Sequence, residues 1–193
     1  MTTSPVDPNR ILLTGENSFI RLAESEGGPH LTRVSHWRIL LSPQGPGHVL
    51  FFKSDVVGDE ILIYSDNIAL TRWLQGEIES LLFPEFADQD IPVINAEFSK
   101  VGDGKSFWTE KITSEEDSIS LAWYDFLEPF MLRVEAGSNP TRPHGVYSCF
   151  IPAQQAQITF NGLVAEGKVF LEPRGDKQSS AACLAWSETW VRP

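Results

Sequence analysis

The alternation of apolar and polar side chains along the chain predicts mostly β-strands. The clearest stretch flanks Asn161-Gly162, a dipeptide that favours a type I′ turn because both central residues need a positive φ. A two-residue turn sets Phe160 opposite Leu163, and side chains alternate between the two faces of a strand. The sequence therefore predicts a hairpin over 156–172 with one apolar face and one mostly polar face, as in an antiparallel sheet.

A third strand is predicted to follow this hairpin, over 182–191. Strict alternation would place Trp186, Glu188 and Trp190 on one face of it. A carboxylate between two indoles is either a rim residue that pairs with a basic neighbour, which is the commoner case, or a buried acid whose pKa is raised by desolvation. Because shifted acids mark functional sites only in some proteins, both interpretations stay open.

The rest of the chain predicts further short strands and one helix. Apolar residues recur at helical spacing over 66–82, where Ser65 or Asp66 would cap the start and Phe83-Pro84 would end the helix. This helix is expected to plug a barrel end or to pack across a sheet. The other predicted strands are 11–13, 18–23 (after a turn at 14–17), 32–42, 49–53, 61–64, 92–101, 106–113, 118–128, 130–136 and 146–151.

About ten strands and one helix favour an all-β, mainly antiparallel meander. We expect a closed barrel of lipocalin-like or calycin-like general shape rather than a sandwich. This analogy rests on the strand count alone, and a fold does not determine a function. Residues 1–10 are expected to be disordered or draped over the surface, and 11–193 to form a single β-barrel domain.

The net charge and the two cysteines indicate which binding partners and which cellular compartment to expect. The net charge of −11 over 193 residues argues against nucleic acids and against anionic membranes, both of which attract basic proteins. The polar opening Met1–Asn9 predicts no signal peptide, and no run approaches the ~20 apolar residues of a membrane span. We therefore expect a cytoplasmic protein in which Cys149 and Cys183 are free thiols, with a disulfide as the alternative if their strands are neighbours.

The sequence carries no strong catalytic or metal-binding motif. It has no glycine-rich phosphate loop, no G-x-S-x-G nucleophile elbow, no H-E-x-x-H and no C-x-x-C. His36 and His48 could meet across a hairpin, yet no further ligands converge on them in the pattern. We therefore predict no metal and no cofactor.

The best remaining constellation combines acids with aromatic residues. Asp125 and Glu188 are the candidate general acid–base groups, because each carboxylate is set beside an indole in its strand. The alternative is that Asp125 forms a structural ion pair with Arg133 and that the indoles belong to the core. The predicted ligand-binding residues are His36, Trp37, Trp123, Tyr124, Arg133, Trp186 and Trp190.

Six Trp and twelve Phe in a chain without a catalytic motif favour a small-molecule-binding β-barrel for an apolar or aromatic ligand. A cofactor-independent isomerase, hydratase, cyclase or lyase that uses Asp125 or Glu188 is the first alternative. The second alternative is a non-catalytic protein-interaction module that docks through a sheet edge or an aromatic patch. A homodimer is also possible under this interpretation. The sequence leaves the ligand and the reaction open.

Overall fold

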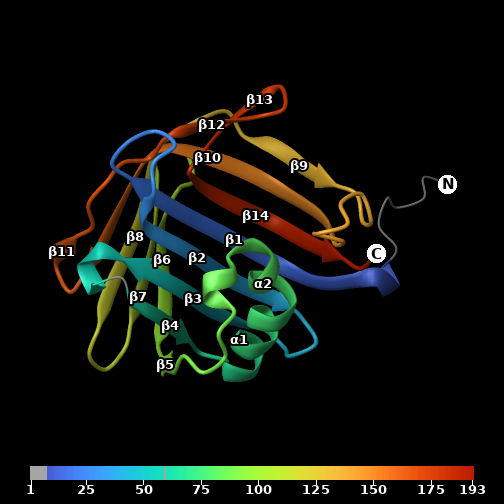
Figure 1. Cartoon of the computed structure of the whole chain (residues 1–193), viewed down its shortest axis with the longest axis horizontal. Helices are drawn as coiled ribbons and strands as arrows, with labels where there is room; N and C mark the ends of the chain where they lie inside the picture. Colours follow the sequence, from blue (N-terminus) through green and yellow to red (C-terminus); the bar gives the residue numbers. More distant parts are fainter. Residues whose placement is uncertain (1–7, 59) are drawn as a thin grey trace.

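The structure is a computed structural model that describes residues 8–58 and 60–193. Ten strands form one sheet in the order β5-β4-β3-β2-β1-β14-β10-β8-β7-β6, and this sheet curls into a nearly closed barrel (Figure 1). β9 and β11 pair with β10, while β12 and β13 form a separate hairpin. The all-β barrel prediction is confirmed.

The strands have the following bounds: β1 Ile11–Ala23, β2 His30–Leu41, β3 Gly47–Ser54, β4 Ile61–Ser65, β5 Val93–Asn95, β6 Glu97–Gly102, β7 Phe107–Thr113, β8 Ser118–Phe126, β9 Phe130–Val134, β10 Gly145–Phe160, β11 Leu163–Val164, β12 Leu171–Arg174, β13 Lys177–Ser180 and β14 Ala182–Val191. The helical segments are η1 Pro8–Arg10, η2 Asp55–Val57, α1 Ile68–Leu74, η3 Gln75–Glu79, α2 Ser80–Leu82 and η4 Pro84–Phe86. Of the predicted N-terminal segment 1–10, residues 1–7 lie outside the described residues, and the rest forms η1.

An apolar cluster packs the barrel interior. It consists of inward-facing side chains from strands all around the sheet. Its members include Ile20, Val34, Phe52, Tyr64, Trp108, Leu121, Trp123, Ile151 and Leu184. A second cluster lies on the outer face of β1, β2 and β3, where the helix covers them. These three strands are therefore buried on both faces, which explains their long apolar runs.

The predicted helix lies over α1, η3 and α2 and ends at Leu82 as expected. Its cap is Asn67, whose Oδ1 accepts from the backbone N–H of Leu70 at 3.0 Å, so the proposed caps Ser65 and Asp66 were wrong. The helix packs across the outside of the sheet instead of plugging the barrel. Among the described residues, no helix is long and apolar enough to cross a membrane.

The predicted turn at 14–17 is wrong, because β1 runs without a break. Gly15 causes no turn: a Cβ there would collide with the carbonyl oxygen of Arg38 on β2, so the glycine permits a close approach of two strands. The β1–β2 register shifts between Thr14 and Gly15, which is a bulge. An isolated glycine in a strand marks such a bulge as readily as a turn.

The Asn161-Gly162 turn is confirmed, with φ values of 50° and 83° and with Phe160 paired to Leu163. The second arm was predicted too long. It stops at Val164, and the chain then passes through Gly167, at φ 98°, to reach an isolated bridge to β1. The chain has left β10 by this point, so the expected strand to 172 does not form.

Both cysteines are free, as predicted. Cys149 packs against the interior cluster, whereas Cys183 belongs to a third cluster on the outer face, beneath β9. Their side chains therefore point to opposite sides of the sheet, which excludes the alternative of a disulfide.

A buried carboxylate ties the helix to the sheet. Glu79, in the π-helical segment η3, is fully buried, and its Oε1 accepts from Ser35 Oγ and from Trp37 Nε1, both at 2.6 Å. Burial raises the pKa of Glu79 to about 7, because desolvation disfavours the charged form more strongly than these two hydrogen bonds favour it.

This pKa predicts a pH-dependent effect of Glu79→Gln on stability. Folding raises the pKa of Glu79 from 4.5 to about 7, so its contribution is full below about pH 4.5 and is lost as the pH rises to 7. Across that window the difference in unfolding free energy between Glu79→Gln and wild type should rise by up to about 1.4 kcal/mol per pH unit, in favour of the variant. Urea unfolding at pH 5, 6 and 7 measures this, with Glu115→Gln as a control for charge removal. A difference that stays constant or shrinks with rising pH would refute it.

Candidate functional site

A bulge in β14 separates the residues that were predicted to share one face. Ser187 has φ 52°, and the register with β10 shifts at this point. Trp186 packs against the barrel interior, whereas Trp190 belongs to the cluster beneath the helix. The predicted common face of Trp186, Glu188 and Trp190 was therefore wrong, because one extra residue in a strand reverses the side chains that follow it.

Glu188 is nevertheless a buried acid and not a surface ion-pair partner. It is 4% exposed and accepts from Trp190 Nε1 at 2.6 Å. Burial raises its pKa to about 7, because desolvation outweighs the favourable hydrogen bonds. The side chain lines a cleft of about 520 Å³ on the outer wall of the barrel and not the barrel interior. Its catalytic role stays a prediction.

The other candidate acid lies elsewhere. Asp125 is exposed near the end of β8, and its Oδ2 accepts from Gln155 Nε2 at 2.6 Å. Arg133, on β9, is also exposed and pairs with Glu135 at 2.6 Å. The alternative of an Asp125–Arg133 ion pair was therefore wrong.

The remaining predicted residues are divided between the two faces of the sheet. Trp123 is fully buried in the interior cluster, and its Nε1 donates to the Phe19 carbonyl. His36 is also buried on the inner face of β2, while Trp37 lies beneath the helix on the outer face. Tyr124, next to Trp123 on β8, is half-buried. The structure therefore does not bring the predicted constellation together.

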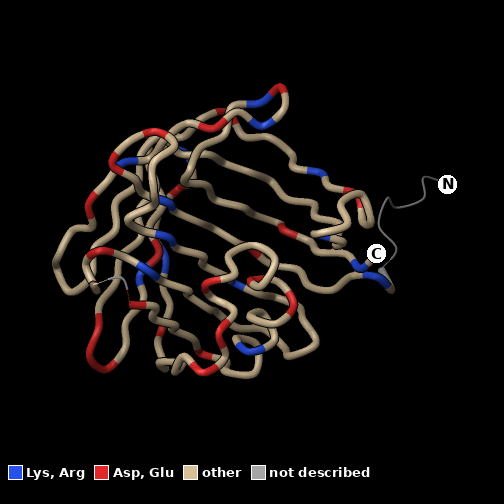
Figure 2. Tube along the Cα trace, in the orientation of Figure 1, with Lys and Arg blue, Asp and Glu red and all other residues tan. Residues whose placement is uncertain are grey.

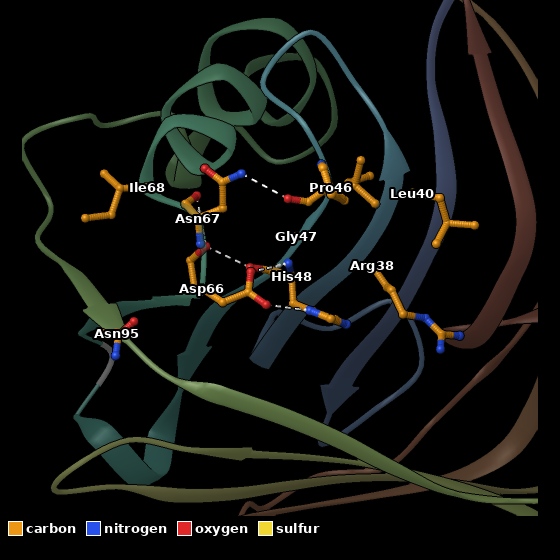
Figure 3. A pocket seen from close by; sticks show the side chains of 11 residues that line it. Arg38, Leu40, Pro46, Gly47, His48, Asp66, Asn67, Ile68 and Asn95 are labelled. Atoms are coloured by element: carbon orange, nitrogen blue, oxygen red, sulfur yellow. Dashed lines mark hydrogen bonds and ion pairs between the residues drawn. The ribbon is translucent and has the colours of Figure 1, made fainter.

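A second cavity opens at one end of the barrel, and we call it the barrel mouth. It has a volume of about 760 Å³ and lies between the β2–β3 turn, the start of α1 and the end of β5. Figure 3 shows Arg38, His48 and Asp66 side by side in it, with Ile68 and Leu40 at opposite sides. The lining also includes Ile39, Pro46, Gly47, Ser65, Asn67 and Asn95.

Asp66 contacts both the backbone and the side chain of His48. Its Oδ1 accepts from the backbone N–H of His48 and its Oδ2 contacts Nδ1, both at 2.7 Å. A carboxylate only accepts, so Nδ1 carries the hydrogen in this contact, and in the neutral ring Nε2 is the acceptor. The imidazole also stacks on Phe98 of β6, with ring centroids 5.0 Å apart and planes at 14°.

Charged groups from three further strands, β1, β2 and β7, lie near this imidazole. Arg38 forms a salt bridge with Glu16 of β1. Glu110 of β7 is 4% exposed and accepts from Trp108 Nε1 at 2.8 Å. Burial raises the pKa of Glu110 to about 7, while the hydrogen bond from Trp108 and the positive charges of Arg38 and His48 oppose the rise. The barrel end thus combines a base, a cation and an acid that titrates near neutrality.

Two buried nitrogens behind the mouth have no hydrogen-bond partner. They are Nε2 of His36 and Nε1 of Trp186. Burial lowers the pKa of His36 to about 3, with smaller contributions from His48 and Arg38, so its imidazole is neutral. Orphaned polar atoms of this kind cost free energy and mark places where a polar group fits.

The sequence interpretation missed the residues of the barrel mouth, although the signal was present. Strands 49–53 and 61–64 follow each other in the predicted order, and the structure pairs Val49 with Ser65. The next residues outward, His48 and Asp66, are therefore opposite each other. Glu110 follows Trp108 by two residues, the same spacing that singled out Asp125 after Trp123 and Glu188 after Trp186.

No group of three or more His, Cys, Asp or Glu side chains within residues 8–58 and 60–193 is placed to hold a metal ion. Comparisons with protein-family models, with curated proteins and with solved structures found no match.

The bulge can be tested at Ser187. A non-glycine residue at positive φ is strained, and a β-branched residue is strained most. Ser187→Gly should be at least as stable as wild type, and Ser187→Val should lose about 1–2 kcal/mol of unfolding free energy. Chemical denaturation of both variants, with Thr189→Val on the same strand as control, measures this. If Ser187→Val were as stable as wild type, the bulge would not exist in solution.

Proposed function

We propose that the protein binds a small neutral molecule at the barrel mouth, with an apolar part on the rim and a polar head against His48. The observation that carries this proposal is the apolar rim around a fixed imidazole. Leu40 is 70% exposed and Ile68 is 60% exposed, and both line the cavity that contains His48. Large apolar side chains left in water beside an oriented polar group are typical of a ligand site.

The charges at the mouth favour a neutral ligand. Glu16 forms a salt bridge with Arg38, and the Asp66 carboxylate accepts from the backbone N–H and from Nδ1 of His48. Neither an anion nor a cation would find an uncompensated partner among these groups. A hydroxyl or carbonyl oxygen would still find hydrogen-bonding groups, since His48 Nε2 accepts and Asn95 offers an amide at the opposite wall.

We also propose that the protein is located in the cytoplasm. Two free thiols are typical of a reducing environment, which supports the cytoplasm.

Binding can be tested with 1-octanol as a neutral probe. Leu40→Gln removes an apolar contact at the rim and should weaken the affinity for 1-octanol about tenfold, because a buried leucine side chain contributes roughly 1.5–3 kcal/mol. Leu163→Gln is the matched control, since Leu163 is 60% exposed on the separate strand β11. Titration calorimetry reports both affinities. Equal losses in the two variants, or no binding by wild type, would contradict the proposal.

The hydrogen bond between Asp66 and His48 favours a second candidate function at the same site, namely acid–base catalysis. An imidazole held at Nδ1 by a carboxylate is the arrangement of a general base, and Glu110 offers a nearby acid that is part protonated at neutral pH. A proton would leave a carbon next to a carbonyl, bind to His48 Nε2 and return to the same or another carbon. No redox partner or cofactor is needed for such a transfer.

This candidate predicts exchange of carbon-bound hydrogen with solvent. In D₂O, the wild-type protein should accelerate deuterium incorporation next to the carbonyl of 2-octanone. His48→Gln should lower the rate at least about a hundredfold, the usual contribution of a general base. Proton NMR of the ketone follows the exchange, and Leu163→Gln again serves as control. Identical rates with wild type and His48→Gln would exclude catalysis by this base.

A further inference from the structure

The cleft lined by Glu188 is a separate cavity on the outer wall of the barrel, and we call it the outer cleft. It lies over β1, β10 and β14, between β9, the end of the helix at Leu82 and Phe83, and the β12–β13 hairpin. Its volume of about 520 Å³ is within the range of ligand pockets. None of its lining residues belongs to the barrel mouth.

Basic side chains gather in the outer cleft although the protein is acidic. Three arginines, Arg21, Arg142 and Arg174, line it in a chain with 15 Lys and Arg residues and a net charge of −11. Figure 2 shows acidic residues spread widely along the chain. Arg21 pairs with Glu172 at 2.7 Å, whereas no carboxylate within residues 8–58 and 60–193 forms a salt bridge with Arg142 or Arg174. Two guanidinium groups therefore have no direct ion-pair partner, although the charge of Arg174 acts on the Glu188 carboxylate in the same cleft.

Two buried nitrogens in this cleft lack partners. Nε of Arg21 and Nδ1 of His144 are shielded from solvent and make no hydrogen bond. The arginine nitrogen can only donate, so the partner that it lacks is an acceptor. Burial lowers the pKa of His144, which keeps its ring neutral and able to donate or to accept. The unsatisfied groups therefore call for oxygen atoms.

Aromatic rings hold the guanidinium groups flat against the cleft wall. Arg174 lies 5.1 Å from the ring centroid of Phe150, and Arg21 lies 5.3 Å from that of Phe19. Stacking on a ring leaves the N–H edge of a guanidinium free, and this edge matches a carboxylate in a two-bond geometry. Trp190 provides a further apolar wall beside His144, with ring centroids 5.9 Å apart.

We propose that the outer cleft binds a small organic acid, a carboxylate carried on an aromatic body. The carboxylate lies against Arg142 and Arg174, and the aromatic part packs between Phe150 and Trp190. Glu188 is the one acid at the base of the cleft besides Glu172, and its bond from Trp190 turns one oxygen away from the ligand.

The probe pair 2-naphthoate and 2-naphthamide tests this site in the full chain. Both share the ring system, and only the first carries a charge. Titration calorimetry at pH 7.5 should show 2-naphthoate binding at least about tenfold more tightly than the amide, as a charge-assisted hydrogen bond contributes more than a neutral one. Arg174→Gln should weaken 2-naphthoate about tenfold. Arg174 is exposed, so its replacement should leave the folded structure intact.

Two control variants distinguish binding in the outer cleft from binding elsewhere on the protein. Lys177→Gln removes a positive charge from the same hairpin but outside the cleft, and should change the affinity less than twofold. Leu40→Gln alters the barrel mouth and should also leave 2-naphthoate binding unchanged. Equal affinity for acid and amide, an equal loss with Lys177→Gln, or no binding at millimolar concentration would overturn the proposal. Loss of binding with Leu40→Gln would place the acid at the mouth and would overturn it as well.

Discussion

The two hydrogen bonds that Asp66 accepts from His48 are the constraint on which the barrel mouth depends. They exist because β3 and β4 pair in register up to Val49 and Ser65, so that the following residues face each other. Asn67, next in the chain, caps the helix and donates its Nδ2 to the Pro46 carbonyl of the β2–β3 turn. Two consecutive residues thus fix the helix, the turn and the imidazole together, and the geometry of the site follows from the fold.

A second theme is the pairing of buried glutamates with indoles. Glu79, Glu110 and Glu188 each accept from a tryptophan Nε1, at 2.6 to 2.8 Å. In each case burial raises the pKa to about 7. An indole N–H partly replaces water for a buried oxygen without adding charge, so the acids stay near the midpoint of their titration at neutral pH. Half of the six tryptophans therefore donate to a buried carboxylate.

The sequence predicted the elements well and their faces poorly. Periodicity located the helix over 66–82 and the Asn161-Gly162 turn, because both signals are local. It failed at Gly15 and Ser187, where a bulge reverses the alternation, because a bulge depends on how two distant strands meet. The sequence left open whether Glu188 is a surface or a buried acid, and the structure shows that it is buried. Its position outside the barrel was not predictable without knowledge of that bulge.

The central claim, that Asp66 orients His48 towards a ligand at the barrel mouth, is tested most directly by ¹⁵N NMR of the His48 imidazole. We predict that the hydrogen lies on Nδ1 in wild type, that Asp66→Asn loses this tautomer preference, and that the Nε2 resonance shifts when 1-octanol is added. A ring protonated at Nε2, or an Nε2 resonance that does not respond to 1-octanol at saturating concentration, would contradict it.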